Sequence, residues 1–500
     1  MSPAPESPLP PSGAAAEEAR FGLGQVDLRM LRVPAEILAL VPADFALQHR
    51  VLPLGWTEGG GLRVAVADPL ATEGVDALAL RLGCAVESVL AAPADLGEAL
   101  RRSYENAPAA ASGPQAAVAW VDGLLREALD RRASDIHVEP MSGRTQVRYR
   151  IDGVLQDGPP VPPPLRLAVG SRLKILAGLS IDEKRVPQDG HLPFSAAGRS
   201  VDLRVSTLPS LHGESLALRV LDRADRPAVD TLGLTPDQRR SLGELLARPD
   251  GLVLVTGPTG SGKTTTLYAC LNHLSGPDRK ILTVEDPIES PLTGVNQVMV
   301  RPDAGMSFAQ ALRAMLRQSP NVIMVGEIRD AETAEVALQA ALTGHLVFST
   351  LHTEDAPGAV ARLADLGLRA NLLASALRGV VAQRLVRTVC SHCSVLAGPV
   401  AHERRLIARY TDLPMDGWRR GTGCTACNGT GYRGRAGLFE FLPVDEAVGA
   451  EIAAGPGARR LRACARTLGW RSLREDGIRK AASGLTTLEE IFSVTPDDPS

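Results

Sequence analysis

The pattern of apolar and polar residues divides the chain into three stretches. Between about residues 28 and 102, alternating segments such as Leu62–Ala67 are typical of half-buried strands and are mixed with helical spacing. From about 116 to 228, one amphipathic helix over Val118–Arg131 precedes several alternating strands. From about 230 onward, short continuous apolar runs are separated by helical stretches, which is typical of a buried parallel sheet with crossover helices. The pattern predicts an α/β chain.

Composition places the boundaries between these stretches. Residues 1–20 are rich in Pro, Ala and Glu and are expected to be disordered, and 106–115 has the composition of a linker. We therefore expect a small N-terminal α/β docking domain over 21–105, an α+β domain over 116–230 and a larger domain over 231–500. The dipeptide Asp152-Gly153 predicts a tight turn between two strands of the α+β domain.

The third stretch contains a phosphate-binding motif. Leu252–Val255 reads as a buried strand, the next residues fit G-x-x-x-x-G-K-[ST], and leucines at helical spacing follow. The glycines let backbone N–H groups face a phosphate chain, the lysine reaches the outer phosphates and the threonine hydroxyl can ligate magnesium. The context of strand, loop and helix predicts a RecA-like ATPase core that binds ATP and Mg²⁺. The expected binding residues are Gly257, Pro258, Thr259, Gly260, Ser261, Gly262, Lys263, Thr264 and Thr265.

Acidic residues follow two further strand patterns. Val322–Val325 is a buried strand with Glu327 beyond it, and Gly326 stands where many P-loop enzymes have a magnesium-binding aspartate. Glu327 is thus a candidate to orient the attacking water, with a plain strand end as the alternative. A second strand ends at Glu285 and Asp286, which either contact magnesium through water or form a solvated turn.

Histidines and arginines offer further candidates. His345 and His352 flank one strand, and either could sense the γ-phosphate or be a structural histidine. Arg204 and Arg219 lie on neighbouring strands of the α+β domain, before a polar stretch over 221–231 that can act as a hinge. Arginines delivered across a domain boundary stabilise phosphoryl-transfer charge, although ordinary surface charges remain the alternative.

Four of the seven cysteines form two C-x-x-C pairs, Cys390 with Cys393 and Cys424 with Cys427. Four thiolates in this arrangement suit tetrahedral zinc in a structural role. We expect residues 388–432 to form a small inserted subdomain, in which Gly429 and Gly431 allow the tight turn whose backbone N–H groups bond to sulfur.

Charge and composition limit the partners. The net charge is −3 and aromatic residues are only 3%, which argues against a nucleic-acid motor. No apolar run of about 18 residues is present, and the N-terminus lacks the order of a signal peptide, so a cytoplasmic protein is expected.

Several motifs together resemble one family. The stretches are ASDIHVEP (133–140), VRYRIDGVL (147–155), KRVPQDG (184–190), DLRVSTLPSLHGES (202–215), the P-loop, ILTVEDPIE (281–289), NVIMVGEIRD (321–330), TGHLVFSTLHT (343–353), RLVRTVC (384–390) and GYRGRAGLFE (431–440). The chain resembles the secretion and type IV pilus assembly ATPases, and most closely the type II secretion ATPases of the general secretion pathway protein E family. Two residues depart from the family pattern: His191 stands where arginine is usual, and Glu354 where asparagine is common.

The resemblance implies roles that the residues alone leave open. It implies an aspartate box at Glu285 and Asp286, a Walker B role for Glu327 and a histidine box at His345 and His352. It also implies that Arg204 and Arg219 face the γ-phosphate from a PAS-like preceding domain, and that the four cysteines form the family's zinc subdomain.

The resemblance further implies a cytoplasmic homo-hexamer at the inner membrane of a Gram-negative-type bacterium. The N-terminal domain would dock on the cytoplasmic domain of a secretion platform protein, and ATP hydrolysis would power pseudopilus assembly and protein export. The alternatives are a type IV pilus extension ATPase and, less favoured, a nucleic-acid motor.

Overall fold

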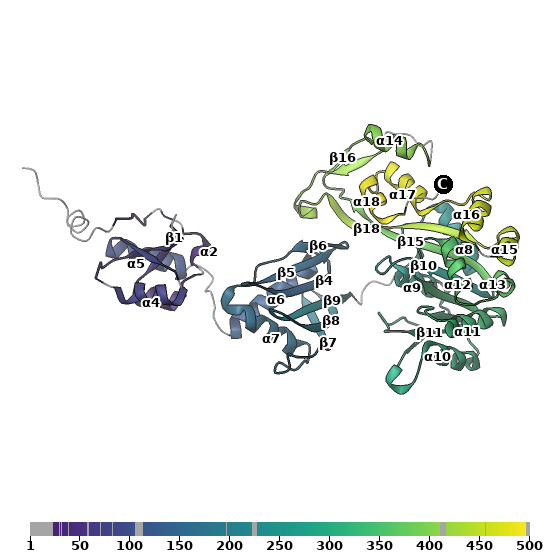
Figure 1. Ribbon diagram of the computed structural model, residues 1–500, viewed down its shortest axis with the longest axis horizontal. Helices are drawn as coiled ribbons and strands as arrows, with labels where there is room; N and C mark the ends of the chain where they lie inside the picture. Colours follow the sequence, from purple (N-terminus) through teal and green to yellow (C-terminus); the bar gives the residue numbers. More distant parts are fainter. Residues whose placement is uncertain are drawn as a thin grey trace, which may run out of the picture.

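The computed structural model of the chain contains three units, each built on its own sheet (Figure 1). The predicted disordered tail, most of the predicted linker and the centre of the predicted hinge lie outside the described residues. Those residues are 24–496 without 30, 32, 39, 58–59, 71, 83, 106–113, 197, 223–227, 411–416 and 456.

The N-terminal unit is a three-stranded sheet in the order β1-β2-β3, with β1 antiparallel and β3 parallel to β2. The parallel connection runs through α4 (Thr72–Leu82), because parallel neighbours need a crossover. The predicted strand over Leu62–Ala67 is confirmed here as β2. The remaining elements are α2 (Ala35–Leu38), α3 (Ala43–His49), β1 (Leu52–Trp56), β2 (Leu62–Val66), β3 (Val86–Leu90), α5 (Pro93–Leu100) and η1 (Arg101–Glu105).

The middle unit is a six-stranded antiparallel sheet in the order β6-β5-β4-β9-β8-β7, with two helices packed on it. In β5 (Arg144–Ile151) every second residue is buried, including Val147 and Tyr149, as the alternating pattern predicts. The other elements are α6 (Pro114–Asp130), β4 (Ala133–Met141), β6 (Val154–Asp157), η2 (Pro163–Leu165), α7 (Arg166–Leu176), β7 (Gln188–Ala196), β8 (Arg199–Ser210) and β9 (Gly213–Asp222).

The C-terminal unit surrounds a seven-stranded sheet in the order β12-β11-β13-β14-β10-β15-β18, parallel except for β18. All residues of β10 (Gly251–Thr256) and β14 (Leu346–Leu351) are buried, because helices cover both faces. Leu252 and Leu254 pack against helices within residues 331–376 on one face, and Val253 and Val255 pack against helices within residues 236–274 on the other. The predicted mixed α/β fold is confirmed.

The first half of this unit, besides β10, comprises η3 (Val229–Thr231), α8 (Pro236–Leu246), α9 (Lys263–Leu274), β11 (Ile281–Glu285), β12 (Val295–Met299), η4 (Pro302–Ala304), α10 (Phe308–Met315), η5 (Leu316–Gln318), β13 (Val322–Val325) and α11 (Ala331–Leu342). The second half comprises α12 (Ala356–Asp365), α13 (Ala370–Ala376), β15 (Leu377–Val389), β18 (Tyr432–Pro443), α15 (Glu446–Ala453), α16 (Ala458–Thr467), α17 (Leu473–Ala482) and α18 (Leu488–Val494). Because the strands are parallel, the carboxyl ends of β10, β11, β13 and β14 lie together at one edge of the sheet.

An excursion separates β15 from β18, which pair with each other as an antiparallel ribbon. It holds a two-stranded sheet of β16 (Ser394–Leu396) and β17 (Arg419–Gly421), together with α14 (Ala401–Ile407) and η6 (Thr425–Cys427). Ile407 and Trp418 of this excursion pack against Ile478 and Ile491 of the C-terminal helices, which anchors it to the unit.

Candidate nucleotide site and metal centre

The P-loop joins β10 to α9 and can only be built with glycines at two positions. Gly257 and Gly262 have φ values of 151° and 87°, which L side chains rarely adopt. A Cβ at Gly257 would lie 2.5 Å from the carbonyl oxygen of Gln383, and one at Gly262 would lie 2.8 Å from Nε2 of Gln383. The loop is thus held tightly against β15, with its N–H groups at the start of a helix where anions bind.

Lys263 occupies the inside of this loop. Its Nζ donates hydrogen bonds to the carbonyl oxygens of Gly257 at 2.7 Å and Pro258 at 3.0 Å. Burial lowers the pKa of Lys263 to about 8, although the negative charge of Glu327 acts in the opposite direction. The Oγ of Ser261 is buried without a hydrogen-bond partner among the described residues, whereas Thr264 and Thr265 are exposed in the first turn of α9.

Glu327 lies just beyond β13 and faces the side chains of an arginine and a histidine. Its carboxylate forms an ion pair with Arg329, and Nε2 of His352 lies 3.4 Å from Oε2 of Glu327. The side chain of Glu327 is 16% exposed, and its charge acts on Lys263. The fold therefore brings Lys263, Glu327 and His352 together from the ends of three parallel strands.

His345 lies at the other end of β14. The strand between His345 and His352 is six residues long, so at about 3.3 Å per residue the two histidines are separated by roughly 20 Å. Nδ1 of His345 lies 3.0 Å from the carbonyl oxygen of Ala340, at the end of α11. Within this chain His345 is thus remote from the P-loop, whereas His352 lies beside Glu327.

Glu285 is buried, with 3% of its surface exposed, and its carboxylate already has three donors. Thr283 and Gln297 donate to it at 2.6 and 3.0 Å, and the hydroxyl of Tyr268 donates as well. Burial raises the pKa of Tyr268 and the negative charge of Glu285 adds to this, so the phenol stays protonated as a donor. Asp286, in contrast, is exposed and interacts electrostatically with Arg329, beside Glu327.

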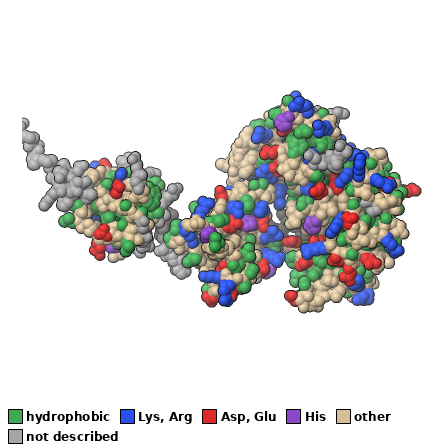
Figure 2. Space-filling model, in the orientation of Figure 1, with side chains coloured by type: hydrophobic (Ala, Val, Ile, Leu, Met, Phe, Trp, Pro, Cys, Tyr) green, Lys and Arg blue, Asp and Glu red, His purple; other side chains and the backbone are tan. Residues whose placement is uncertain are grey.

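Arg204 and Arg219 are register partners on β8 and β9, so they lie side by side on an exposed part of the middle sheet. Nε of Arg219 lies 3.0 Å from Oδ1 of Asp135. Figure 2 shows Lys and Arg side chains on the side of the middle unit that faces the C-terminal unit. No hydrogen bond or ion pair between described residues joins either arginine to the P-loop.

The four cysteines of the two C-x-x-C pairs converge in the excursion between β15 and β18. The sulfurs of Cys390 and Cys424 are 3.9 Å apart, those of Cys393 and Cys427 are 3.9 Å apart, and those of Cys424 and Cys427 are 3.7 Å apart. A tetrahedral zinc with bonds of about 2.3 Å requires sulfurs about 3.8 Å apart. The cluster therefore has the dimensions of a Cys₄ zinc site.

Backbone N–H groups of the second C-x-x-C turn bond to sulfur, as expected. The N–H of Gly431 donates to Sγ of Cys427 at 3.2 Å, as expected. The N–H of Gly429 instead donates to the carbonyl oxygen of Cys424 at 2.9 Å, and the second donor to Cys427 is the N–H of Cys424 at 3.2 Å. The N–H of Gly429 thus closes the turn on a carbonyl group, while two other N–H groups of the turn bond to sulfur.

Comparison with known proteins identifies the family. The model of the type II/IV secretion system protein family matches residues 111–493, and that of the MshEN domain matches residues 21–110. The chain belongs to the type II/IV secretion system protein family. The resemblance inferred from the sequence motifs is confirmed.

Individual members of the family are similar over much of their length. The type II secretion system protein HxcR of Pseudomonas aeruginosa is 50% identical over 381 residues, which cover 76% of this chain and 77% of that protein. The type IV pilus assembly ATPase PilB of Myxococcus xanthus is 41% identical over 96% of this chain and 90% of that protein. A crystal structure of the pilus retraction motor PilT with bound ADP matches 75% of this chain and 97% of that chain, with a TM-score of 0.52 and 29% identity. The P-loop ATPase fold and the ATP hydrolase class predicted from the motifs are confirmed.

This secretion ATPase also contains site residues that the motif analysis missed. Oγ1 of Thr266 donates to Oε1 of Gln383 at 2.7 Å, and Nη2 of Arg384 donates to the carbonyl oxygen of Glu354 at 2.7 Å. Both β15 residues are buried, and burial lowers the pKa of Arg384. The available signal was a polar pair between the apolar stretches 379–382 and 385–386 of β15, since buried polar groups need specific partners.

Proposed function

We propose that this chain is the ATPase that powers pseudopilus assembly and protein export in a type II secretion system. The observation that carries the proposal is the convergence of Lys263, Glu327 and His352 at one edge of the sheet, in a chain of the secretion ATPase family. Burial of Lys263 beside carbonyl groups prepares the site for a ligand that brings negative charge.

The residues can share the reaction as follows. The N–H groups of Gly257 and of residues 259–263 would hold the phosphates, Lys263 would lie against the outer ones, and the Thr264 hydroxyl would ligate magnesium, whose charge would offset that of the phosphates. Glu327 orients a water, which attacks the γ-phosphorus; a new O–P bond forms while the bond to the leaving ADP oxygen breaks. His352 holds the Glu327 carboxylate in place.

The buried carboxylate of Glu285 has a different proposed role. Its three donors from α9, β11 and β12 tie the P-loop helix to the sheet, which makes it a positioning residue. We assign no catalytic role to His345, because its ring is bonded at the opposite edge.

Arg204 and Arg219 are proposed to reach ATP by closure of the middle unit about the 221–231 stretch. A guanidinium from a separately moving unit couples hydrolysis to unit position, which a motor needs. We further propose a homo-hexamer whose N-terminal unit docks on the cytoplasmic part of an inner-membrane platform protein. Of the helices described, none is both long and apolar enough to cross a bilayer.

Cys390, Cys393, Cys424 and Cys427 are proposed to hold one structural zinc. Four thiolates complete the tetrahedron, so no position remains for a reactive water. His392 is instead beside Arg433, with 3.3 Å between its Nε2 and Nη1 of the arginine.

Two variants test the ATPase site. Lys263→Ala should abolish ATP hydrolysis in a folded protein, whereas Glu327→Gln should keep ATP bound and slow its hydrolysis. Turnover is measured beside nucleotide-binding titration. Wild-type turnover in Lys263→Ala would refute the site, and loss of binding in Glu327→Gln would make Glu327 a magnesium ligand instead.

Type IV pilus extension is the second candidate, since the PilB relative aligns with 96% of this chain, including the N-terminal unit. Binding of the full chain to the cytoplasmic domains of secretion and pilus platform proteins distinguishes the two. Stimulation of ATP turnover by DNA would support the alternative that the chain is a nucleic-acid motor, against which the composition argues.

A further inference from the structure

We infer that the zinc subdomain is the docking surface for the middle unit, and that the turn Asp152–Gly153 is the element it receives. The surface is formed by residues 424–434, here called the zinc knuckle. The inference rests on the proposed function in one respect: the docked unit is the carrier of Arg204 and Arg219.

One hydrogen bond joins the two units directly. The N–H of Gly434 donates to Oδ2 of Asp152 at 2.7 Å, across 282 positions of sequence. The side chain of Asp152 is only 15% exposed, and Nη2 of Arg132 lies 4.0 Å from the same oxygen. A charged acceptor makes this a stronger bond than one between neutral groups.

The local geometry of the knuckle explains why this N–H is available. The pairing of β15 with β18 shifts register between Arg387 and Val389, so β18 bulges at Arg433 and Gly434. Gly434 has φ of 88°, and a Cβ there would lie 3.3 Å from Oγ1 of Thr388. The bulge turns a backbone donor away from the ladder, and only glycine adopts this conformation without strain.

The turn on the other side has a matching shape. Asp152 and Gly153 have φ values of 50° and 89°, the two positive values that a tight hairpin turn requires. The turn lies between β5 and β6 at the end of the sheet, and its carboxylate reaches the knuckle. Asp and Gly tolerate these angles, so one dipeptide supplies both the turn conformation and the carboxylate that accepts the hydrogen bond.

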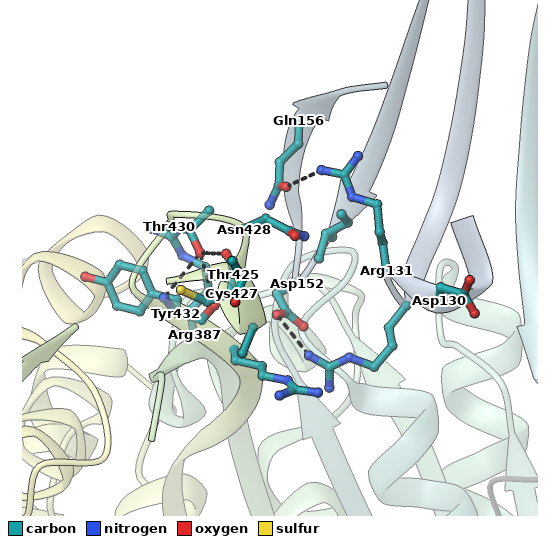
Figure 3. Close-up of a pocket in the computed structure, with 14 residues that line it drawn as sticks. Asp130, Arg131, Asp152, Gln156, Arg387, Thr425, Cys427, Asn428, Thr430 and Tyr432 are labelled. Carbon is teal, nitrogen blue, oxygen red and sulfur yellow. Dashed lines mark hydrogen bonds and ion pairs between the residues drawn. The ribbon is translucent and has the colours of Figure 1, made fainter. Parts of the chain in front are cut away.

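The zinc ligands shape the surface that receives the turn. Asp152, Arg132 and Gln156 line a pocket of about 180 Å³ together with Cys427, Asn428 and neighbouring knuckle residues (Figure 3). Sγ of Cys427 is bonded to the backbone of Cys424 and Gly431, so the knuckle backbone is folded around the sulfurs. Metal at the four sulfurs would therefore hold the docking surface in shape.

Docking controls where the arginines lie. Asp152 and Arg219 belong to one continuous sheet, since β4 pairs with both β5 and β9. In the docked arrangement the described contacts of Arg219 are within the middle unit, to Asp135. Because the turn and Arg219 belong to the same sheet, docking of the turn on the knuckle also fixes the arginine-bearing unit against the C-terminal unit.

Hydrogen exchange of the full chain, followed by mass spectrometry of peptides that cover Gly434, tests the docking. Asp152→Ala should raise exchange at Gly434 about tenfold or more, because a charge-assisted hydrogen bond is lost. Asp157→Ala is the matched control: its carboxylate lies on the same hairpin but accepts from Gln146, and exchange at Gly434 should stay at the wild-type level. Removal of metal with a chelator should reproduce the effect of Asp152→Ala.

Several outcomes would overturn the inference. Unchanged exchange in Asp152→Ala, with circular dichroism confirming a folded chain, would show that the turn is not docked. Unchanged exchange after metal removal would show that zinc does not shape the surface. A difference seen only in oligomers, and absent from the monomeric fraction, would assign the docked turn to a neighbouring copy. Turnover of Arg219→Ala tests the proposed function separately, because that variant keeps the Asp152 contact.

Discussion

Binding of nucleotide to the P-loop should be coupled to proton uptake by Lys263. In the structure the ammonium group is buried beside two carbonyl oxygens, and its pKa falls from 10.5 to about 8. Since one pKa unit is worth about 1.36 kcal/mol, burial costs the charged form about 3 kcal/mol. A triphosphate at the same place favours the charged form and should return the pKa toward its ordinary value.

The sign and size of the effect follow from this difference. At pH 8 about half of the free protein has a neutral Lys263, and at pH 9 about nine-tenths has. Binding should therefore take up about 0.5 proton at pH 8 and about 0.9 at pH 9. Because protons are taken up on binding, affinity should fall as pH rises above 8, by up to roughly tenfold per unit.

Isothermal titration calorimetry with a non-hydrolysable ATP analogue, in buffers of different ionisation enthalpy, measures the uptake. Above pH 8 the phosphates themselves are fully ionised, since their last pKa is near 6 to 7. Lys263→Arg should abolish the proton uptake on binding, because arginine stays charged in the free protein. Lys184→Arg changes an exposed lysine of the middle unit and serves as the control. Equal uptake in the wild type and Lys263→Arg, or none between pH 8 and 9, would refute the reasoning.

Three further predictions concern other parts of the chain. Arg204→Ala and Arg219→Ala should each lower turnover about 10³-fold or more with ATP affinity little changed; parallel losses of binding and turnover would make them structural charges. Elemental analysis should find one zinc per chain, and Cys427→Ser should destabilise residues 388–432 while nucleotide binding is retained; a stable, metal-free protein would contradict this. Tyr268→Phe leaves the buried Glu285 carboxylate one hydrogen-bond donor short and should lower the free energy of unfolding by about 1–3 kcal/mol. Denaturant titration measures this loss, and an unchanged unfolding midpoint would contradict it.

Local patterns in the sequence were sufficient for the elements and for two of the sites. The strand over Leu252–Val255, the glycines after it and the helix that follows are neighbours along the chain, so their spacing alone predicts the P-loop. The two C-x-x-C pairs likewise predict a Cys₄ cluster, because each pair presents two thiolates from one tight turn. Alternation in β5 and continuous burial in β10 and β14 followed from the apolar pattern.

Contacts between distant segments could not be read in this way. His345 and His352 are only seven positions apart and share a motif, yet the direction and length of β14 put them at opposite edges of the sheet. Glu285 ends a strand as expected, but its partners Tyr268 and Gln297 depend on how α9 and β12 pack around β11.

Gln383 and the Asp152 turn also have partners that the sequence pattern could not predict, because those partners are still farther away along the chain. Gln383 reaches Thr266 because β15 returns beside β10, and Asp152 reaches Gly434 although 282 positions of sequence separate them. Periodicity and turn chemistry act over a few residues, since they depend on backbone conformation and one buried face. Which polar groups meet depends on strand order, crossover direction and the register of a bulge, and these arise only when the whole chain packs.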